Sequence, residues 1–267
     1  MYIFTFLYIK IISFFNYLIV LNEKNITCSN EVIVSFTTIP SRSLYILDTL
    51  NSILNQTLLP NMIYIGIPYI SLREPGLDYK FSKRIDNHKL IKIIYYEKDE
   101  GPIMKLLTGL RELQVLKKYS KIITIDDDII YEKHLIENLL REAKKNENNV
   151  YCTIGRNAIG EKLFNTSNFL QTVEGYGGVI YKSSFFNLSE LFFYRDIPYY
   201  IKTNDDLFIS AYLRTKNIKI YGIKNNISQP LSRYLNTRKS NPLWIINKTN
   251  YSKAATYLNI FISNQEE

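Results

Sequence analysis

The chain has 267 residues, of which 33 are Lys or Arg and 25 are Asp or Glu, so its formal net charge is +8 at pH 7. A composition of 46% hydrophobic and 22% charged residues, with 10 Gly and 8 Pro, excludes a disordered, collagen-like or linker-dominated chain. Its two cysteines, Cys28 and Cys152, exclude a disulfide framework and a thiolate zinc site.

The first 21 residues are almost wholly apolar and are interrupted by Lys10 and Asn16. About 20 apolar residues suffice to span a bilayer as a helix, whereas a lysine near the middle costs roughly 3 kcal/mol on insertion scales. No small-residue cleavage pattern precedes Asn25, which argues against a cleaved signal peptide. We interpret residues 1–30 as a hydrophobic segment that anchors the protein in a membrane through residues 2–21. The alternative is a strand or helix docked on an otherwise cytoplasmic protein.

Strand and helix patterns alternate from residue 31 onward. Buried-strand patterns cover residues 32–39, 62–67, 90–96 and 121–125, and apolar residues at helical spacing cover 44–54, 103–113 and 135–140. This alternation predicts a single α/β domain over residues 31–227, with a mostly parallel central sheet flanked by helices. Residues 228–267 are predicted to be a C-terminal extension with Arg233, Arg238 and Trp244, which closes over a donor's diphosphate or contacts an acceptor; a packed tail is the alternative.

Three consecutive aspartates, Asp126, Asp127 and Asp128, directly follow the fourth strand pattern. In an extended backbone Asp126 and Asp128 project to one side and Asp127 to the other. Neighbouring carboxylates repel unless a cation or proton compensates them, and Mg²⁺ or Mn²⁺ usually takes one or two protein carboxylates plus substrate phosphates. Because open α/β sheets bind ligands beyond the carboxyl ends of their strands, we predict a metal–phosphate site here. The alternative is a solvated acidic turn in which one aspartate caps a helix.

Five segments in this order resemble motifs of the nucleotide-sugar-dependent glycosyltransferases of the GT-A fold, close to family 2. They are SFTTIPSR with SILNQ (35–42 and 52–56), DEGPIMKLL (99–107), IITIDDDIIY (122–131), EGYGGVIYK (174–182) and NDDLFIS (204–210). The resemblance covers about residues 31 to 223 and implies a single GT-A-like domain. It also implies that the Asp-x-Asp pair, Asp126 and Asp128, contacts the donor's ribose and the metal ion that bridges its pyrophosphate, with Asp127 beside them at the nucleotide.

Further donor-site candidates lie in the first and second of these segments. Thr37 and Arg42 follow the first strand, where Arg42 stacks on a base or pairs with phosphate; an exposed arginine at a helix start is the alternative. Asp99 and Lys105 flank Gly101-Pro102, a region that lies near the nucleotide in the resembling enzymes. The alternatives are a helix cap for Asp99 and a solvated lysine for Lys105.

Two segments nearer the C-terminus are predicted to contact the sugar and the acceptor. Three glycines in residues 174–178 permit close backbone approach, so Gly177 and Gly178 are predicted in a sugar-binding loop, with a bulged turn as the alternative. Asp205 and Asp206 begin a helix, where the dipole alone favours carboxylates. Resembling inverting enzymes place the acceptor-activating carboxylate here, so we predict Asp206, ahead of Asp205, as the catalytic base.

The chain departs from the resembling family in its histidines. Many GT-A enzymes add a histidine metal ligand near the end of the domain, but this chain has only His88 and His134. The metal ligands are therefore predicted to be Asp126 and Asp128, together with phosphates and water.

The sequence thus predicts a metal-dependent, inverting, hexosyltransferase-like glycosyltransferase. Its cofactor would be Mn²⁺ or Mg²⁺, its donor a nucleotide-diphosphate sugar, and its acceptor a hydroxyl of a glycan, protein or lipid, with no nucleic-acid partner. One alternative is a metal-dependent nucleic-acid-processing enzyme, which also uses clustered aspartates and gains from a charge of +8. The other is a catalytically inactive carbohydrate-binding relative.

Overall fold

The computed structural model describes residues 28–115, 121–191, 197–224 and 250–259. The predicted anchor at residues 2–21 lies outside the described residues, as do Arg233, Arg238 and Trp244 of the C-terminal extension. Within the described part of the chain, no helix is both long and apolar enough to cross a membrane.

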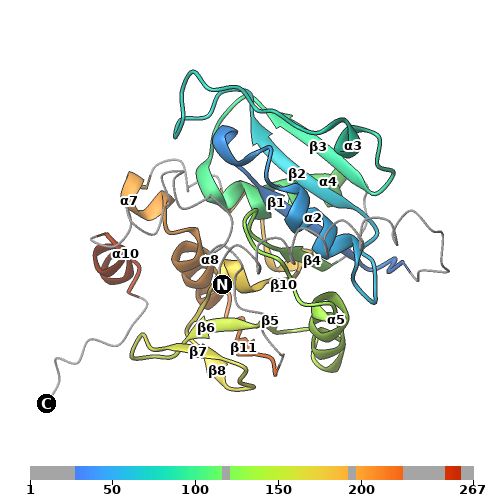
Figure 1. Cartoon of the computed structure of the whole chain (residues 1–267). Helices are drawn as coiled ribbons and strands as arrows, with labels where there is room; N and C mark the ends of the chain where they lie inside the picture. The colour runs from blue at the N-terminus through green and yellow to red at the C-terminus, as the bar shows by residue number, and fades with distance from the viewer. Residues whose placement is uncertain (1–27, 116–120, 192–196, 225–249, 260–267) are drawn as a thin grey trace, which may run out of the picture.

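An eight-stranded mixed sheet forms the centre of the domain (Figure 1), in the order β3-β2-β1-β4-β10-β5-β11-β8. Strands β3, β2, β1 and β4 are parallel to one another, whereas β10 pairs antiparallel with both β4 and β5. The predicted α/β class with a mostly parallel central sheet is confirmed. The eight strands are β1 (Val32–Thr37), β2 (Ile63–Pro68), β3 (Ile91–Tyr96), β4 (Lys121–Thr124), β5 (Val150–Cys152), β8 (Phe169–Leu170), β10 (Val179–Lys182) and β11 (Ile220–Gly222).

Helices cover both faces of this sheet because its strands are apolar on both sides. Along β1, Val32, Val34 and Phe36 pack in one core with α2 (Leu47–Leu54), α3 (Lys83–Asp86) and α5 (Leu135–Lys145). The alternate residue Ile33 faces the opposite core, formed with α4 (Met104–Val115) and α8 (Asp205–Thr215). Successive strand residues point to opposite faces, so a strand buried on both sides reads as a continuous apolar run, as the sequence of β1 does.

A second, three-stranded antiparallel sheet has the order β7-β6-β9. It consists of β6 (Ile154–Arg156), β7 (Lys162–Phe164) and β9 (Thr172–Val173), and the sequence did not predict it. In Figure 1 it lies below α8 and α10 (Tyr251–Tyr257), on the side of the molecule away from β2 and β3. Short helices α6 (Leu188–Leu191) and α7 (Tyr199–Lys202) precede α8, and α10 packs against α7 and α8 through Ala254 and Ala255.

The predicted elements occur in the predicted order, with shifted ends. β1 ends at Thr37, two residues before the predicted end, and Pro40 opens a short 3-10 helix, η1 (Pro40–Arg42), before α2. The second 3-10 helix, η2 (Gly101–Ile103), precedes α4, with Pro102 in the first turn where its missing N–H leaves no bond unmade. The connection between β2 and β3 contains the short helix α3, for which the sequence shows no helical pattern.

Candidate functional site

A cavity of about 620 Å³ lies at the carboxyl ends of the parallel strands. This is the edge at which open α/β sheets bind ligands. Its other walls come from the start of α8, the end of β9 and the start of α10. Eight of the predicted site residues line it: Thr37, Arg42, Asp99, Lys105, Asp126, Asp127, Asp205 and Asp206. Asp128, Gly177 and Gly178 do not.

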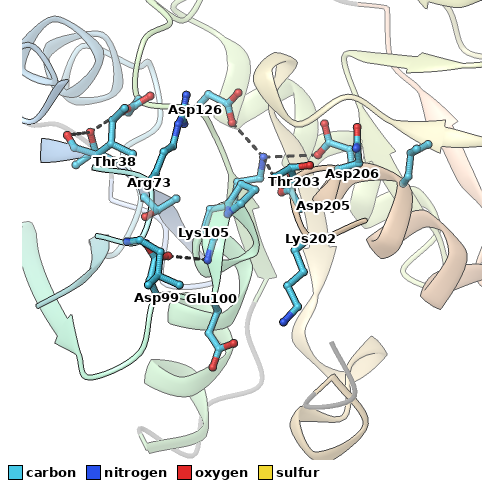
Figure 2. A pocket seen from close by; sticks show the side chains of 18 of the residues that line it. Thr38, Arg73, Asp99, Glu100, Lys105, Asp126, Lys202, Thr203, Asp205 and Asp206 are labelled. Atoms are coloured by element: carbon cyan, nitrogen blue, oxygen red, sulfur yellow. Dashed lines mark hydrogen bonds and ion pairs between the residues drawn. The ribbon is translucent and has the colours of Figure 1, made fainter. Parts of the chain in front are cut away.

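A buried lysine stands between the acidic residues of two distant segments. Lys105 Nζ lies 3.1 Å from Asp126 Oδ1, 3.1 Å from Asp205 Oδ2 and 3.5 Å from Asp206 Oδ1. Figure 2 shows its ammonium group between Asp126 on one side and the α8 carboxylates on the other. The Lys105 side chain is 5% exposed, so the alternative of a solvated lysine is wrong. An ammonium group has three donors, and three carboxylates surround this one.

The charge of Lys105 is set by its neighbours. Burial alone would lower the pKa of Lys105, but Asp126, Asp205 and Asp206 together raise it well above the ordinary lysine value. Lys105 is therefore the permanent counter-charge that connects the end of β4 to the start of α8. Lys105 is the second residue of α4, which begins directly after η2 and so sets the position of this side chain.

The two α8 carboxylates differ in how they meet the cavity. Asp205 is nearly buried, with a side chain 9% exposed, whereas the Asp206 side chain is 28% exposed. Asp206 Oδ2 accepts a hydrogen bond from the Gly175 N–H at 2.8 Å, which fixes the carboxylate's orientation. Burial raises the pKa of Asp206 to about 8, with Lys105 opposing and the Asp205 charge adding to the rise. A partly exposed carboxylate with a pKa of about 8 can accept a proton from a substrate at or above that pH.

The aspartate triplet divides between two basic residues. Asp126 turns to Lys105, while Asp127 Oδ1 and Asp128 Oδ2 lie 2.6 Å and 3.1 Å from the same guanidinium nitrogen, Arg42 Nη1. The prediction that Asp126 and Asp128 project to the same side is therefore wrong, because the two carboxylates contact different basic residues. It assumed an extended backbone, but β4 ends at Thr124 and the chain turns at residues 127 and 128.

Asp127 anchors the loop after β1 to the triplet. Its Oδ2 accepts a 2.5 Å hydrogen bond from the Thr38 hydroxyl, and its carbonyl accepts one from Thr49 at 2.9 Å. Burial raises the pKa of Asp127, and Arg42 and Thr38 oppose that rise. For Asp128, burial and the neighbouring Asp127 charge raise the pKa to about 7.

Two residues outside the predicted set hold the site in shape. The Tyr131 hydroxyl accepts a hydrogen bond from the Asp126 N–H at 2.8 Å and donates one to the Tyr176 carbonyl at 3.0 Å. A Cβ at Gly175 would lie 2.4 Å from Lys105 Nζ and 2.7 Å from Asp206 Oδ1, so a larger residue there would have to displace both charged groups. Tyr131 ends the segment at residues 122–131, but as one of 22 tyrosines it was not predicted to hold the site in shape.

The other glycines of that segment have packing roles. A Cβ at Gly177 would lie 2.4 Å from Thr153 Oγ1, and one at Gly178 would lie 3.1 Å from Leu135. The Asp99 carboxylate, although it lines the cavity, accepts hydrogen bonds from the N–H groups of Leu72 (2.8 Å) and Gly101 (2.7 Å). Asp99 therefore fixes the loop that lines the cavity, a role similar to the helix cap that is its alternative interpretation.

The carboxylates of the cavity suit a divalent cation whose remaining ligands come from a substrate. Among the described residues, no group of three or more His, Cys, Asp and Glu side chains is placed to hold a metal ion alone. Asp126 lines the cavity with a side chain 35% exposed, and Mg²⁺ or Mn²⁺ commonly takes one or two carboxylates plus phosphate oxygens. Asp126 fits that role; Asp128 is turned towards Arg42.

Comparisons with known proteins find solved structures that resemble this chain only weakly. Neither a protein-family model nor a curated protein matches the chain. One similar solved structure is the Francisella tularensis 2-C-methyl-D-erythritol 4-phosphate cytidylyltransferase (12% identity, 76% of this chain and 95% of that one, TM-score 0.44). Another is GalNAc-T7 with UDP, GalNAc and Mn²⁺ (12% identity, 76% of this chain but only 43% of that one, TM-score 0.45). A third is a 4-diphosphocytidyl-2C-methyl-D-erythritol synthase (7% identity, 83% of this chain, 100% of that one, TM-score 0.47). Similarities this weak carry no argument about activity, which has to rest on the site.

Proposed function

We propose that this protein is a glycosyltransferase that moves a sugar from a nucleotide-diphosphate-sugar donor to a hydroxyl acceptor, with inversion. The observation that carries the proposal is the single cavity in which Lys105 joins Asp126, at the end of β4, to Asp206, at the start of α8. A donor site at the strand ends and a base at α8 would then lie within reach of one substrate pair. The resemblance of five ordered segments to GT-A enzymes supports the same activity.

The donor's diphosphate belongs at the carboxyl ends of β1 and β4. Arg42, which lines the cavity while paired with Asp127 and Asp128, would contact the phosphates there, and Thr37 and Thr38 form the adjoining wall. Asp126 would hold a divalent cation together with phosphate oxygens and water. Asp128, the second ligand predicted from the sequence, pairs with Arg42 and would have to turn away from it to join Asp126. Such a cation would supply positive charge to the departing diphosphate when bound.

The acceptor's hydroxyl belongs at Asp206. In an inverting displacement the hydroxyl oxygen forms a bond to the anomeric carbon while the bond from that carbon to the diphosphate oxygen breaks. The hydroxyl proton passes to the Asp206 carboxylate, and the electron pair of the broken bond leaves with the diphosphate. Lys105 and the Gly175 N–H hold Asp206 in place for this transfer.

The charge of the cavity disfavours the nucleic-acid alternative. Acidic and basic side chains line it in nearly equal number, with Asp99, Glu100 and Glu174 among the acids. A nucleic-acid backbone is bound mainly by neutralising its phosphates with Lys and Arg, and such a balanced lining offers little net charge for that. Membrane attachment through residues 2–21 stays a prediction.

A nucleotide-sugar screen tests the proposal. Wild-type protein, Asp206→Asn and the surface control Lys92→Met are incubated with UDP-, GDP-, CDP- and TDP-sugars plus Mn²⁺, and release of nucleoside diphosphate is measured. We expect at least one donor to be turned over by wild type and Lys92→Met, and turnover to fall at least about 100-fold in Asp206→Asn, as for loss of a general base. No release from any donor by wild type would contradict the proposal, and would leave the inactive binding relative.

A further inference from the structure

Two basic side chains of the small sheet, Arg156 and Lys162, also line the cavity and have no part in the reaction described above. Arg156 ends β6, Lys162 begins β7 and Glu174 follows β9, so all three come from the small sheet. We call Arg156 and Lys162 the basic fork.

Glu174 holds the fork together. Its Oε1 lies 2.5 Å from Arg156 Nε and its Oε2 lies 3.0 Å from Lys162 Nζ, so each carboxylate oxygen binds one basic group. Glu174 is the most buried of the three, with a side chain 13% exposed against 24% for Arg156 and 31% for Lys162. Two positive charges and one negative charge thus leave the fork and Glu174 together with a net charge of +1.

Further contacts fix the two basic groups in position. Arg156 Nη1 donates to the Gly160 carbonyl at 2.8 Å, and its guanidinium lies 5.0 Å from the ring centroid of Tyr251 on α10. Lys162 Nζ lies 4.9 Å from the ring centroid of Tyr176. A pair of cations held in advance by an acid and two rings loses little entropy when it binds an oxyanion.

The fork is connected through the backbone to the proposed base. Glu174 is followed directly by Gly175, whose N–H donates to Asp206 Oδ2. An acceptor whose hydroxyl meets Asp206 would therefore extend its remaining atoms along this wall, away from the nucleotide end. We propose that the basic fork binds a negatively charged group, a carboxylate or a phosphate, carried by the acceptor. This proposal rests on the proposed function, because only that function places the acceptor beside Asp206.

Direct binding measurements test the fork without any turnover. Methyl glucuronide and glucose 6-phosphate serve as charged probes, and methyl glucoside as the neutral counterpart, titrated calorimetrically into wild type, Lys162→Met, Arg156→Met and the surface control Lys92→Met. We expect the charged probes to bind wild type and the control at least about tenfold more tightly than the glucoside. Both fork variants should lose that preference while keeping the circular dichroism of wild type. Equal binding of charged and neutral probes to wild type, or an unchanged preference in a folded Lys162→Met, would overturn the proposal.

Two further arms separate the outcomes. Glucuronide and phosphate probes distinguish a carboxylate-bearing from a phosphate-bearing acceptor. If UDP-glucuronate binds more tightly than UDP-glucose through the fork, the charge belongs to the donor and the acceptor assignment is overturned. Nucleoside diphosphates titrated into wild type test the proposed function separately: if none binds but charged sugars still need Lys162, the proposed function fails while the fork remains an anion site.

Discussion

Replacing Lys105 with methionine tests whether one buried ammonium group holds the site together. The change keeps the apolar stem and removes the charge, leaving Asp126, Asp205 and Asp206 close together without a counter-ion. Removing one partner of a buried ion pair costs about 3–5 kcal/mol. Because Asp126 is partly exposed and the α8 pair can take up protons, we expect the lower end, about 3 kcal/mol. At roughly 2–4 °C per kcal/mol for a domain of this size, the melting temperature should fall by about 6–12 °C.

The same change should alter the pH dependence of activity. Lys105 opposes the rise of the Asp206 pKa, and an opposite charge at this range lowers a carboxylate pKa by about 1–3. A base works only when deprotonated, so wild-type activity should fall as pH drops through about 8. In Lys105→Met that fall should begin at a pH about 1–3 higher.

The raised pKa of Asp206 also predicts how the free energy of unfolding depends on pH. With its pKa raised above the unfolded value, Asp206 binds more protons in the folded state, so its contribution to the free energy of unfolding declines as pH rises towards the folded pKa. Lys105→Met raises the folded pKa further, so its deficit should be larger at pH 9 than at pH 6. The assays are urea unfolding at both pH values and a pH profile of donor hydrolysis, with Lys92→Met, a mostly exposed lysine, as control. A variant as stable as wild type, with an unmoved pH profile, would refute the counter-charge role of Lys105.

Other substitutions test single contacts. Asp206→Asn removes the proposed base and should abolish turnover. The amide still accepts the hydrogen bond from the Gly175 N–H and carries no buried charge, so the variant should be at least as stable as wild type at pH 9. Lower stability in urea unfolding at that pH would count against this. Thr38→Val removes the hydrogen bond to Asp127 and should cost about 1.5–3 kcal/mol; an unchanged denaturation midpoint would show that the bond contributes nothing. Gly175→Ala should cost about 1–3 kcal/mol through overpacking against Lys105 and lower turnover, and wild-type kinetics would contradict the close approach.

Much of the main sheet could be predicted because its strands are apolar on both faces and its helices have one apolar side. Val32, Val34 and Phe36 alternate with Ile33 in a short run that is rich in β-branched residues and is followed by Pro40, which favours a strand buried on both sides. The small sheet could not be predicted, since β6, β7 and β9 have two or three residues each and show no periodicity. Its basic fork was missed for the same reason.

The chemistry of the site could be predicted better than its contacts. The acidic triplet, Lys105 and the α8 pair were identified by residue type and order, and all of them except Asp128 line one cavity. That Lys105 would be buried among three carboxylates could not be predicted, because its partners are 21 and about 100 residues away in the chain. The turn at Asp127 was missed as well, since the sequence continues the apolar strand without a break until Ile125.

The proposed transfer reaction requires that Asp126 binds the donor and Asp206 activates the acceptor inside one cavity. Calorimetric titration of a nucleoside diphosphate with Mn²⁺ into wild type, Asp126→Asn and Asp206→Asn, followed by turnover of the matching sugar donor, measures both halves. We predict that Asp126→Asn loses Mn²⁺-dependent nucleotide binding, whereas Asp206→Asn binds like wild type and fails to turn over. Undiminished nucleotide binding in Asp126→Asn, or normal turnover in Asp206→Asn, would contradict the account.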